Sequence, residues 1–145
     1  RPLLLLTLFA VDRVTKYWAA QWLMPRISVA VLPFFSLTYV ENTGAAFGIG
    51  HSRNYFFAVL SVALLGMLFY LQRKWPKENI WLQAGLLLVT AGALGNLYDR
   101  LRYGYVVDFL DFKVWPVFNF ADSCVTVGAC CLAWGLRRED LAVPH

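Results

Sequence analysis

The chain has 145 residues, of which 59% are hydrophobic and only 15% are charged, with a formal net charge of +4. Soluble domains contain roughly 25% charged residues, so this composition argues against a soluble domain and predicts an integral membrane protein. In a membrane protein, basic residues gather in cytoplasmic loops, and the positive charge is therefore not evidence for nucleic-acid binding.

Four segments are apolar over roughly 20 residues, the length of helix that spans a bilayer. We expect them to form one integral-membrane domain over residues 1–145, with helices at about 2–23, 54–71, 80–97 and 118–136. A cleaved signal peptide is the alternative for the first segment. However, Tyr17, Trp18 and Trp22 follow its leucines where small residues would mark a cleavage site. We therefore favour a retained helix with an interfacial aromatic belt.

The loops predict an orientation in the membrane. Three cations lie within the short connector Arg73–Lys77, and Arg137 and Arg138 follow the last helix. Both groups fall on one side if the helices alternate, and the positive-inside rule makes that side cytoplasmic. Both termini are then cytoplasmic, and the longer loops Met24–Arg53 and Tyr98–Val117 lie on the outer face.

The first long loop has a pattern typical of β-strands. Apolar residues alternate with small or polar ones over 27–31 and 35–39, and Pro33 stands between the two runs. Exposed backbone cannot lie in hydrocarbon, so these strands should sit at or above the headgroups. The expected fold class is an all-α membrane protein with four transmembrane helices and a small β-rich extracytoplasmic cradle formed by the outer loops.

The first helix contains an acid and a base four residues apart, Asp12 and Lys16. Such a pair can satisfy itself on one helix face, and a structural ion pair is the favoured interpretation over a catalytic one. Arg13 is expected to point elsewhere and to extend toward the headgroups.

Two further polar groups follow. Asn42 precedes Gly44 in a turn that is either ordinary or suited to gripping a peptide backbone, since an amide both donates and accepts hydrogen bonds. Asn96 lies within the apolar third segment and needs a buried partner. Asp99 beside Arg100 is typical of a surface pair, although Arg100 near an outer-face site could bind a carbonyl, a phosphate or a carboxylate.

Asp108 and Asp122 are 14 residues apart and flank a predicted membrane boundary, with Asn119 one helical turn before Asp122. Carboxylates within a membrane are costly and usually functional. Two close carboxylates in a low dielectric share one proton, which provides a general base for water and a general acid for a carbonyl oxygen. The pair therefore predicts an aspartic-type peptide hydrolase.

Metal binding is poorly supported, because two carboxylates without histidine or thiolate suit only a hard ion. The cysteines all lie in the fourth segment and are interpreted as small apolar residues: Cys124, Cys130 and Cys131.

Taken together, the sequence resembles the lipoprotein signal peptidase family, the signal peptidase II of bacteria. The resemblance covers nearly the whole chain and rests on five ordered motifs: Asp12–Lys16, Val40–Gly48, Gly95–Arg100, Val106–Phe109 and Phe118–Asp122.

The resemblance implies an aspartic endopeptidase of the bacterial inner membrane that acts without a metal or organic cofactor. It implies that the enzyme removes the signal peptide from lipid-modified prolipoproteins by cutting before the diacylglyceryl-cysteine. The family's catalytic pair falls on Asp108 and Asp122, and Asp12, Lys16 and Asp99 support the site. The residues that contact substrate and the cyclic peptide inhibitor globomycin are expected to be Asn42, Gly44, Asn96, Arg100 and Asn119. Membrane lipids are the other expected partners, and a monomer is expected.

A small four-helix proton-coupled transporter is the alternative function, with Asp12 as a proton relay. The long outer loops and the placement of Asp108 and Asp122 at one interface argue against it.

Overall fold

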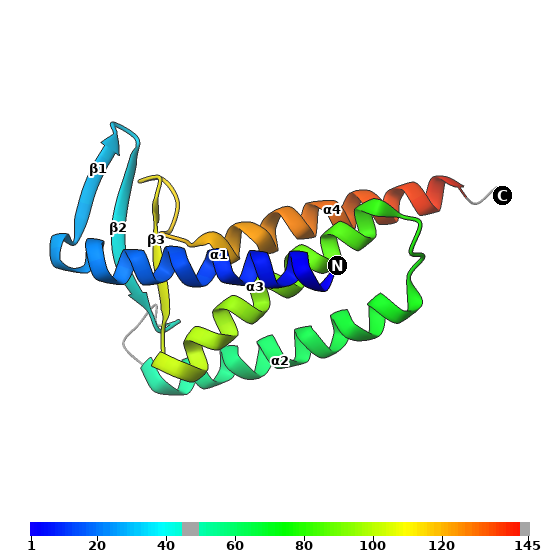
Figure 1. The fold of residues 1–145 in the computed structure, drawn as a ribbon, viewed down its shortest axis with the longest axis horizontal. Helices are drawn as coiled ribbons and strands as arrows, with labels where there is room; N and C mark the ends of the chain where they lie inside the picture. The colour runs from blue at the N-terminus through cyan, green and yellow to red at the C-terminus, as the bar shows by residue number, and fades with distance from the viewer. Residues whose placement is uncertain (45–49, 143–145) are drawn as a thin grey trace.

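The computed structural model describes residues 1–44 and 50–142, which form four long helices and a three-stranded sheet at one end (Figure 1). The helices are α1 (Pro2–Trp18), α2 (Gly50–Lys74), α3 (Ile80–Tyr103) and α4 (Phe120–Ala142). The strands are β1 (Ser28–Leu32), β2 (Phe35–Asn42) and β3 (Val106–Asp111). The four predicted helices are therefore present, and α2, α3 and α4 extend beyond their predicted C-terminal ends.

Local sequence signals explain where these helices begin and end. Pro2 occupies the first turn of α1, where its missing N–H is not needed. The predicted first helix is not one continuous α-helix, because a π-helical segment at Ala19–Leu23 and a 3-10 turn at Met24–Arg26 follow α1. The side chain of Asn79 caps the start of α3, and Gly104 ends it with a left-handed φ of 82°.

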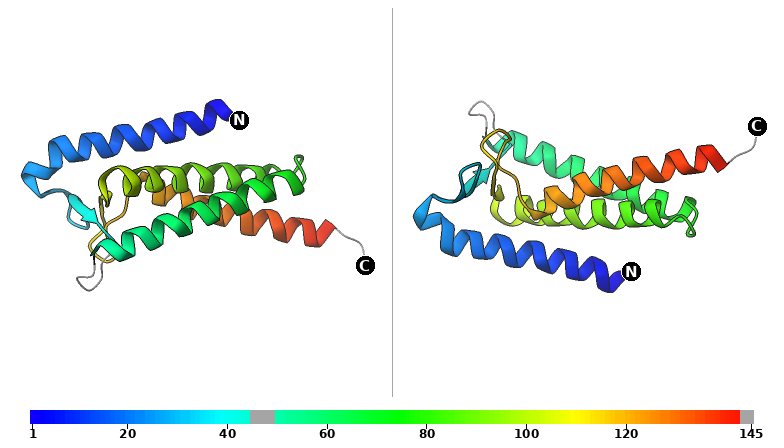
Figure 2. Two further views of the ribbon diagram at one scale, coloured as in Figure 1. Left: turned by 90° about the horizontal axis from the view of Figure 1, so that it is seen from below. Right: turned by 90° about the horizontal axis from the view of Figure 1, so that it is seen from above.

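Helix α3 is the central element of the bundle and packs against α1, α2 and α4. The first view in Figure 2 shows α3 between α1 and the other two helices. Gly92 permits a close approach of α3 to α4, because a Cβ at this position would overlap the carbonyl oxygen of Ala121. The contact with α2 is apolar and buries Leu68, Leu86 and Val89. This packing places the C-terminal half of α3 beside the N-terminal end of α4.

The sheet is antiparallel in the order β1-β2-β3. The predicted β-rich region is thus confirmed, and β1 and β2 form its hairpin. Strand β3 comes from the second long loop, where an apolar stretch gave no alternation signal. Val40 of β2 pairs with Asp108 of β3, so strand register places Asp108 within the sheet.

One buried cluster attaches the sheet to the helices. Ala19 and Leu23, which follow α1, pack with Val107 and Phe109 of β3. These apolar contacts hold β3 against the chain that follows α1. Because Val107 and Phe109 flank Asp108, the same contacts fix the position of that carboxylate.

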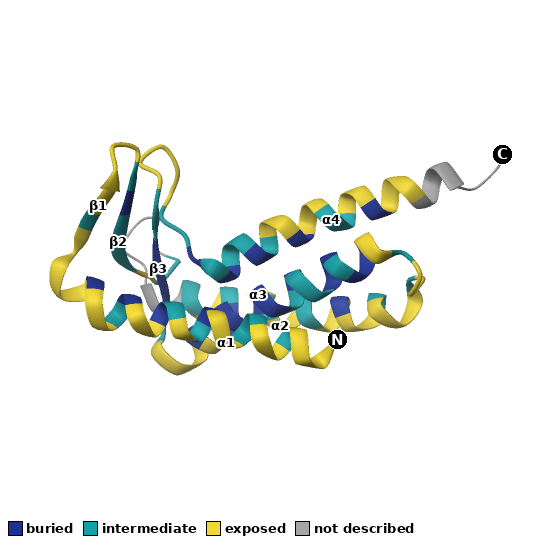
Figure 3. Ribbon diagram, turned by 45° about the horizontal axis from the view of Figure 1, so that its top comes forward, coloured by how far each residue is buried: buried dark blue, intermediate teal, exposed yellow. Residues whose placement is uncertain are grey.

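The exposed surface of the helices is strongly apolar. Figure 3 shows long exposed stretches on α1 and α2, and large side chains such as Leu6, Phe56 and Phe69 lie more than half exposed there. Within the described residues, two segments are long and apolar enough to cross a membrane, Arg53–Lys74 and Ile80–Tyr103. Contiguous apolar surface of this kind marks contact with lipid or another protein.

Candidate active site

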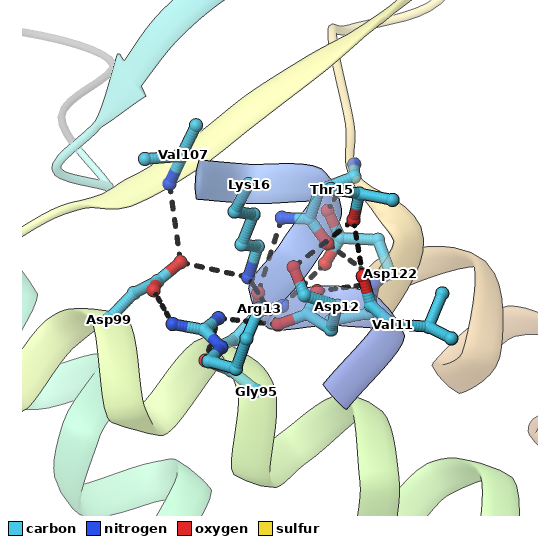
Figure 4. Close-up of polar contacts among 12 residues, drawn as sticks. Val11, Asp12, Arg13, Thr15, Lys16, Gly95, Asp99, Val107 and Asp122 are labelled. Carbon is cyan, nitrogen blue, oxygen red and sulfur yellow. Dashed lines mark hydrogen bonds and ion pairs between the residues drawn. The ribbon is translucent and has the colours of Figure 1, made fainter. Parts of the chain in front are cut away.

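Four charged side chains meet between α1 and α3 (Figure 4). Lys16 Nζ lies 2.8 Å from Asp99 Oδ2 and 3.2 Å from Asp12 Oδ2. Arg13 donates to Asp99 Oδ1 over 2.5 Å and also to Asp12. Two acids and two bases are therefore paired into a neutral group, which we call the α1–α3 ion cluster.

This cluster confirms the contact between Asp12 and Lys16 and corrects two expectations. Arg13 does not extend toward headgroups, because both of its terminal nitrogens bond acids and one also donates to the Gly95 carbonyl at 3.0 Å. Asp99 is not a surface residue, since its exposed fraction is 1%. Arg13 and Lys16 both point into the bundle, because two buried carboxylates require two cations.

The start of α4 is fixed by reciprocal capping. Asn119 Oδ1 accepts the N–H of Asp122 at 2.9 Å, and Asp122 Oδ2 accepts the N–H of Asn119 at 3.3 Å. This is the geometry of a capping box, with an acidic residue in the first turn of the helix. Asp12 Oδ1 also accepts the N–H of Ala121 at 3.2 Å, so the ion cluster holds the same turn.

Asp108 lies on β3, almost fully buried, and both of its oxygens accept hydrogen bonds. Asn119 Nδ2 donates to Oδ1 over 2.7 Å and Asn42 Nδ2 donates to Oδ2 over 2.9 Å. Burial, together with the negative charge of Asp122, raises the pKa of Asp108 to about 6 despite these bonds. This carboxyl group therefore binds a proton more readily than an ordinary aspartate.

Asn42 is oriented by a tight turn at the end of β2. The N–H of Gly44 donates to Asn42 Oδ1 at 2.8 Å, which leaves Nδ2 free to donate to Asp108. Gly44 has a φ of 75°, and a Cβ there would overlap the ring of Phe57. Gly44 thus permits the turn that orients Asn42, and the rest of the second motif, residues 45–48, lies outside the described residues.

Asn96 connects the ion cluster to the carboxylates. Its Oδ1 accepts from Lys16 Nζ at 2.8 Å and from Asn119 Nδ2 at 3.2 Å, and its Nδ2 donates to Asp122 Oδ1 at 2.7 Å. Asn96 therefore has the buried partners that its position in an apolar segment requires: Lys16, Asp122 and Asn119. A single hydrogen-bonded network runs from Asp99 through these residues to Asp108.

Arg100 lies at the edge of this network. Its guanidinium is within electrostatic reach of Asp122 and Asp108 and stands 5.5 Å from the ring of Phe57. Among the side chains that the structure describes, residues 1–44 and 53–138, it has no ion-pair partner. A cation held near two carboxyl groups without its own counter-ion is suited to bind a carbonyl or carboxylate of a ligand.

Asp122 also borders an apolar cavity of about 450 Å³. Its apolar lining includes the side chains of Phe112, Trp115, Phe118 and Val127. The cavity is within the size range of small-molecule sites, which are mostly apolar with a few polar groups. Asp122 supplies its carboxylate. Among the described residues, no three histidine, cysteine, aspartate or glutamate side chains gather as a metal site would require.

The arrangement is a pair of carboxyl groups, each held by amide donors, at the junction of a sheet and two helices. The profile of the signal peptidase II family matches residues 4–137 of the chain. The chain belongs to the signal peptidase II family. Members of this family are proteases that process lipoproteins, so the peptidase reading of the sequence is confirmed at family level and the transporter alternative is not supported.

Individual relatives agree with this family assignment. The lipoprotein signal peptidase of Caldanaerobacter subterraneus subsp. tengcongensis is 48% identical over 126 residues, covering 86% of this chain and 86% of the relative. The lipoprotein signal peptidase of Moorella thermoacetica is 44% identical over 138 residues, covering 93% and 92%. A solved structure described as a bacterial membrane enzyme is 35% identical with a TM-score of 0.84, covering 95% of this chain and 87% of that one.

Sequence reasoning did not identify the role of Arg13. The signal was present in the charges of the first and third motifs, which together contain two acids, Asp12 and Asp99, and three bases, Arg13, Lys16 and Arg100. A pairing within one helix uses only Asp12 and Lys16, and it leaves Arg13 without a partner in an apolar environment.

Proposed function

We propose that the protein is an aspartic endopeptidase that removes the signal peptide from lipid-modified prolipoproteins by cutting before the diacylglyceryl-cysteine. Asp108 and Asp122 are its catalytic pair. The observation that carries this proposal is Asn119, which donates its amide to Asp108 while capping the helix turn that contains Asp122. One side chain thus ties together two carboxyl groups that belong to different elements.

The proposed reaction uses one proton shared by the pair. We assign the proton to Asp108, because burial and the charge of Asp122 raise its pKa to about 6 and so make it the readier proton acceptor of the two at mildly acidic pH. Asp122 accepts a proton from water as the water oxygen bonds to the scissile carbonyl carbon, and Asp108 gives its proton to the carbonyl oxygen. The tetrahedral intermediate then collapses: the carbon–nitrogen bond breaks, the amine takes the proton from Asp122, and the hydroxyl proton returns to Asp108. The pair ends in its starting state.

Polar side chains around the pair have roles in binding the substrate. A signal peptide arrives as a membrane helix whose scissile bond is already hydrogen-bonded, so that bond must be unwound before it is cut. Asn42 and Asn119 donate to the two oxygens of Asp108, and they are proposed to exchange these bonds for the freed backbone when substrate enters. Arg100 binds a substrate carbonyl, because its guanidinium has no counter-ion of its own among the described residues. Asn96 and Gly44, which were also expected to contact the substrate, are proposed instead to hold Asp122 and Asn42 in position.

All four helices are proposed to cross the bacterial inner membrane. The sheet lies at one end of the bundle, while the start of α1, the α2–α3 connection and the end of α4 lie toward the other (Figure 2). This arrangement supports a multi-pass topology with both termini cytoplasmic and the sheet covering the active site at the outer face. The ion cluster allows α1 to enter the bilayer, since its charges are mutually neutralised.

The proposed partners follow from this function. They are lipid-modified prolipoprotein signal peptides and membrane lipids, and the cyclic peptide globomycin as an inhibitor of the same site. The protein is proposed to act as a monomer, because a single chain can supply both carboxyl groups and the amides that hold them.

The decisive experiment is cleavage of a synthetic prolipoprotein peptide by the purified protein in detergent, with the products identified by mass spectrometry. The peptide with a diacylglyceryl-cysteine should be cut just before that cysteine. The same peptide with an unmodified cysteine serves as the matched control and should be cut slowly or not at all. Equal cleavage of both peptides, or cleavage at another bond, would contradict the proposed specificity.

A further inference from the structure

The orientation of one buried amide affects the position of Asp122. Asn96 has an oxygen and a nitrogen at the end of its side chain, and only the nitrogen can donate to a carboxylate. In the structure the nitrogen faces Asp122 Oδ1 at 2.7 Å and the oxygen faces Lys16 Nζ at 2.8 Å. The opposite orientation would place two acceptors against each other at Asp122 and two donors against each other at Lys16.

Lys16 is the charged group that selects this orientation. An ammonium has three donors and no acceptor, so it accepts only the amide oxygen as a partner. Lys16 is 97% buried, and hydrogen bonds to a charged group are stronger than neutral ones when water is excluded. The other donor to Asn96 Oδ1, the amide of Asn119, is neutral and more distant at 3.2 Å.

From this geometry we infer that Lys16 is a positioning residue for catalysis, acting through the Asn96 amide on Asp122. The inference rests on the proposed function and deepens it. It differs from a structural ion pair with Asp12, because the bond that matters for activity is the one from Nζ to Asn96. Lys16 is not a catalytic residue, since Asn96 lies between it and the carboxylate.

A purely structural role and a positioning role of Lys16 predict different effects of K16M in the D99N protein. Asp99 is the acid closest to Lys16 Nζ, at 2.8 Å. In the D99N protein the remaining cluster has two bases and one acid, so K16M restores its charge balance through the pair of Arg13 and Asp12. If Lys16 serves only to neutralise acids, K16M in this background leaves activity unchanged or raises it. If Lys16 orients Asn96, activity falls while thermal stability is held or raised.

The test is a double-mutant cycle within the D99N protein. Single-turnover cleavage of the diacylglyceryl-cysteine peptide is measured for D99N, D99N/K16M, D99N/N96L and D99N/N96L/K16M, together with melting temperatures. With Asn96 present, K16M should lower the cleavage rate at saturating substrate at least about tenfold, as expected for a charge-assisted hydrogen bond, with KM little changed. In the N96L background K16M should have almost no effect on that rate.

Equal effects of K16M in the two backgrounds, whether large or absent, would overturn the inference, because Lys16 would then act independently of Asn96. A loss of folding caused by K16M in both backgrounds counts as such an equal effect. The proposed function is checked separately by the wild-type protein on the same peptide. If the wild-type protein does not cleave the peptide, the proposed function is wrong. If the wild type cleaves it but K16M changes the rate by the same factor with and without Asn96, only the role of Lys16 is wrong.

Discussion

Asn119 Nδ2 donates a hydrogen bond of 2.7 Å to Asp108 Oδ1, which joins the first residue before α4 to the middle of β3. The same side chain caps α4 through its oxygen. An asparagine is suited to this position because its amide donates at one atom and accepts at the other. The geometry of the two carboxyl groups is therefore set jointly by a helix cap and a strand.

Replacing either member of the pair should abolish most activity. D108N and D122N keep the side-chain shape but remove the carboxyl group that transfers a proton, and cleavage should fall by at least about 10²-fold. D111N is a matched control on the same strand, because Asp111 bonds Thr38 and Lys113 and has no bond to the site network. Wild-type turnover by a folded D108N or D122N protein would remove the catalytic assignment.

Asn119 allows the cap and the carboxyl contact to be separated. Serine is also a good N-cap, so N119S should preserve the start of α4 and change the free energy of unfolding by roughly 1 kcal/mol or less. Serine is too short to reach Asp108 from the same position, and cleavage should fall at least about tenfold. Parallel loss of stability and activity, measured by thermal unfolding and peptide cleavage, would indicate that Asn119 is only a cap.

The pH dependence of cleavage follows from the proton shared by the pair. The folded protein raises the pKa of Asp108 from 3.8 to about 6, so the protonated form is present below about pH 6 and is lost as pH rises through that value. We expect kcat/KM to fall with rising pH around 6, since the general acid disappears. Bound substrate excludes more water and should shift the corresponding fall in kcat to higher pH. A rise in kcat/KM through pH 6 would instead make Asp108 the base.

The sequence predicted the helices and the polar residues of the site better than it predicted how those residues are connected. Helices at about 54–71 and 80–97 follow from long apolar runs, and the hairpin β1–β2 follows from period-two alternation. Strand β3 is buried on both faces and therefore has apolar residues on both, Val106, Val107 and Phe109. Such a strand lacks the alternation of apolar and polar residues by which the other two strands were recognised.

The connections depend on tertiary packing that no local pattern contains. The capping of α4 by Asp12 joins residues 109 positions apart, and the bond from Lys16 to Asn96 joins residues 80 positions apart. Spacing on a helix pairs Asp12 with Lys16, but it cannot show that Arg13 and Asp99 complete the group. Burial decides this, because an unpaired charge in the interior is too costly to keep.

The ion cluster predicts a specific pattern of stability. D12N or K16M alone leaves an uncompensated buried charge, and each should lower the free energy of unfolding by roughly 3–5 kcal/mol. The double variant D12N/K16M should recover part of this loss, because the pair of Arg13 and Asp99 at 2.5 Å remains balanced. Thermal unfolding in detergent measures both effects.

An exposed ion pair provides the matched control for these variants. Lys113 lies 3.1 Å from Asp111 with its side chain 48% exposed, and K113M should change the free energy of unfolding by less than about 1 kcal/mol. Additive losses in D12N/K16M would show that the four charges do not act as one group.

A larger residue where α3 packs against α4 should disturb the active site without replacing any of its residues. A Cβ at Gly92 would overlap the backbone oxygen of Ala121, and backbone cannot move aside as a flexible side chain does. G92A should therefore push the first turn of α4 away from α3 and disturb the bond between Asn96 and Asp122. We expect overpacking to cost roughly 1–3 kcal/mol of stability and to lower cleavage at the same time.

Gly66 of α2 is the matched control, because no atom lies within 4 Å of its added Cβ, and G66A should be neutral or slightly stabilising. Wild-type cleavage and stability in G92A would show that the spacing of α3 and α4 at Ala121 does not determine the position of Asp122.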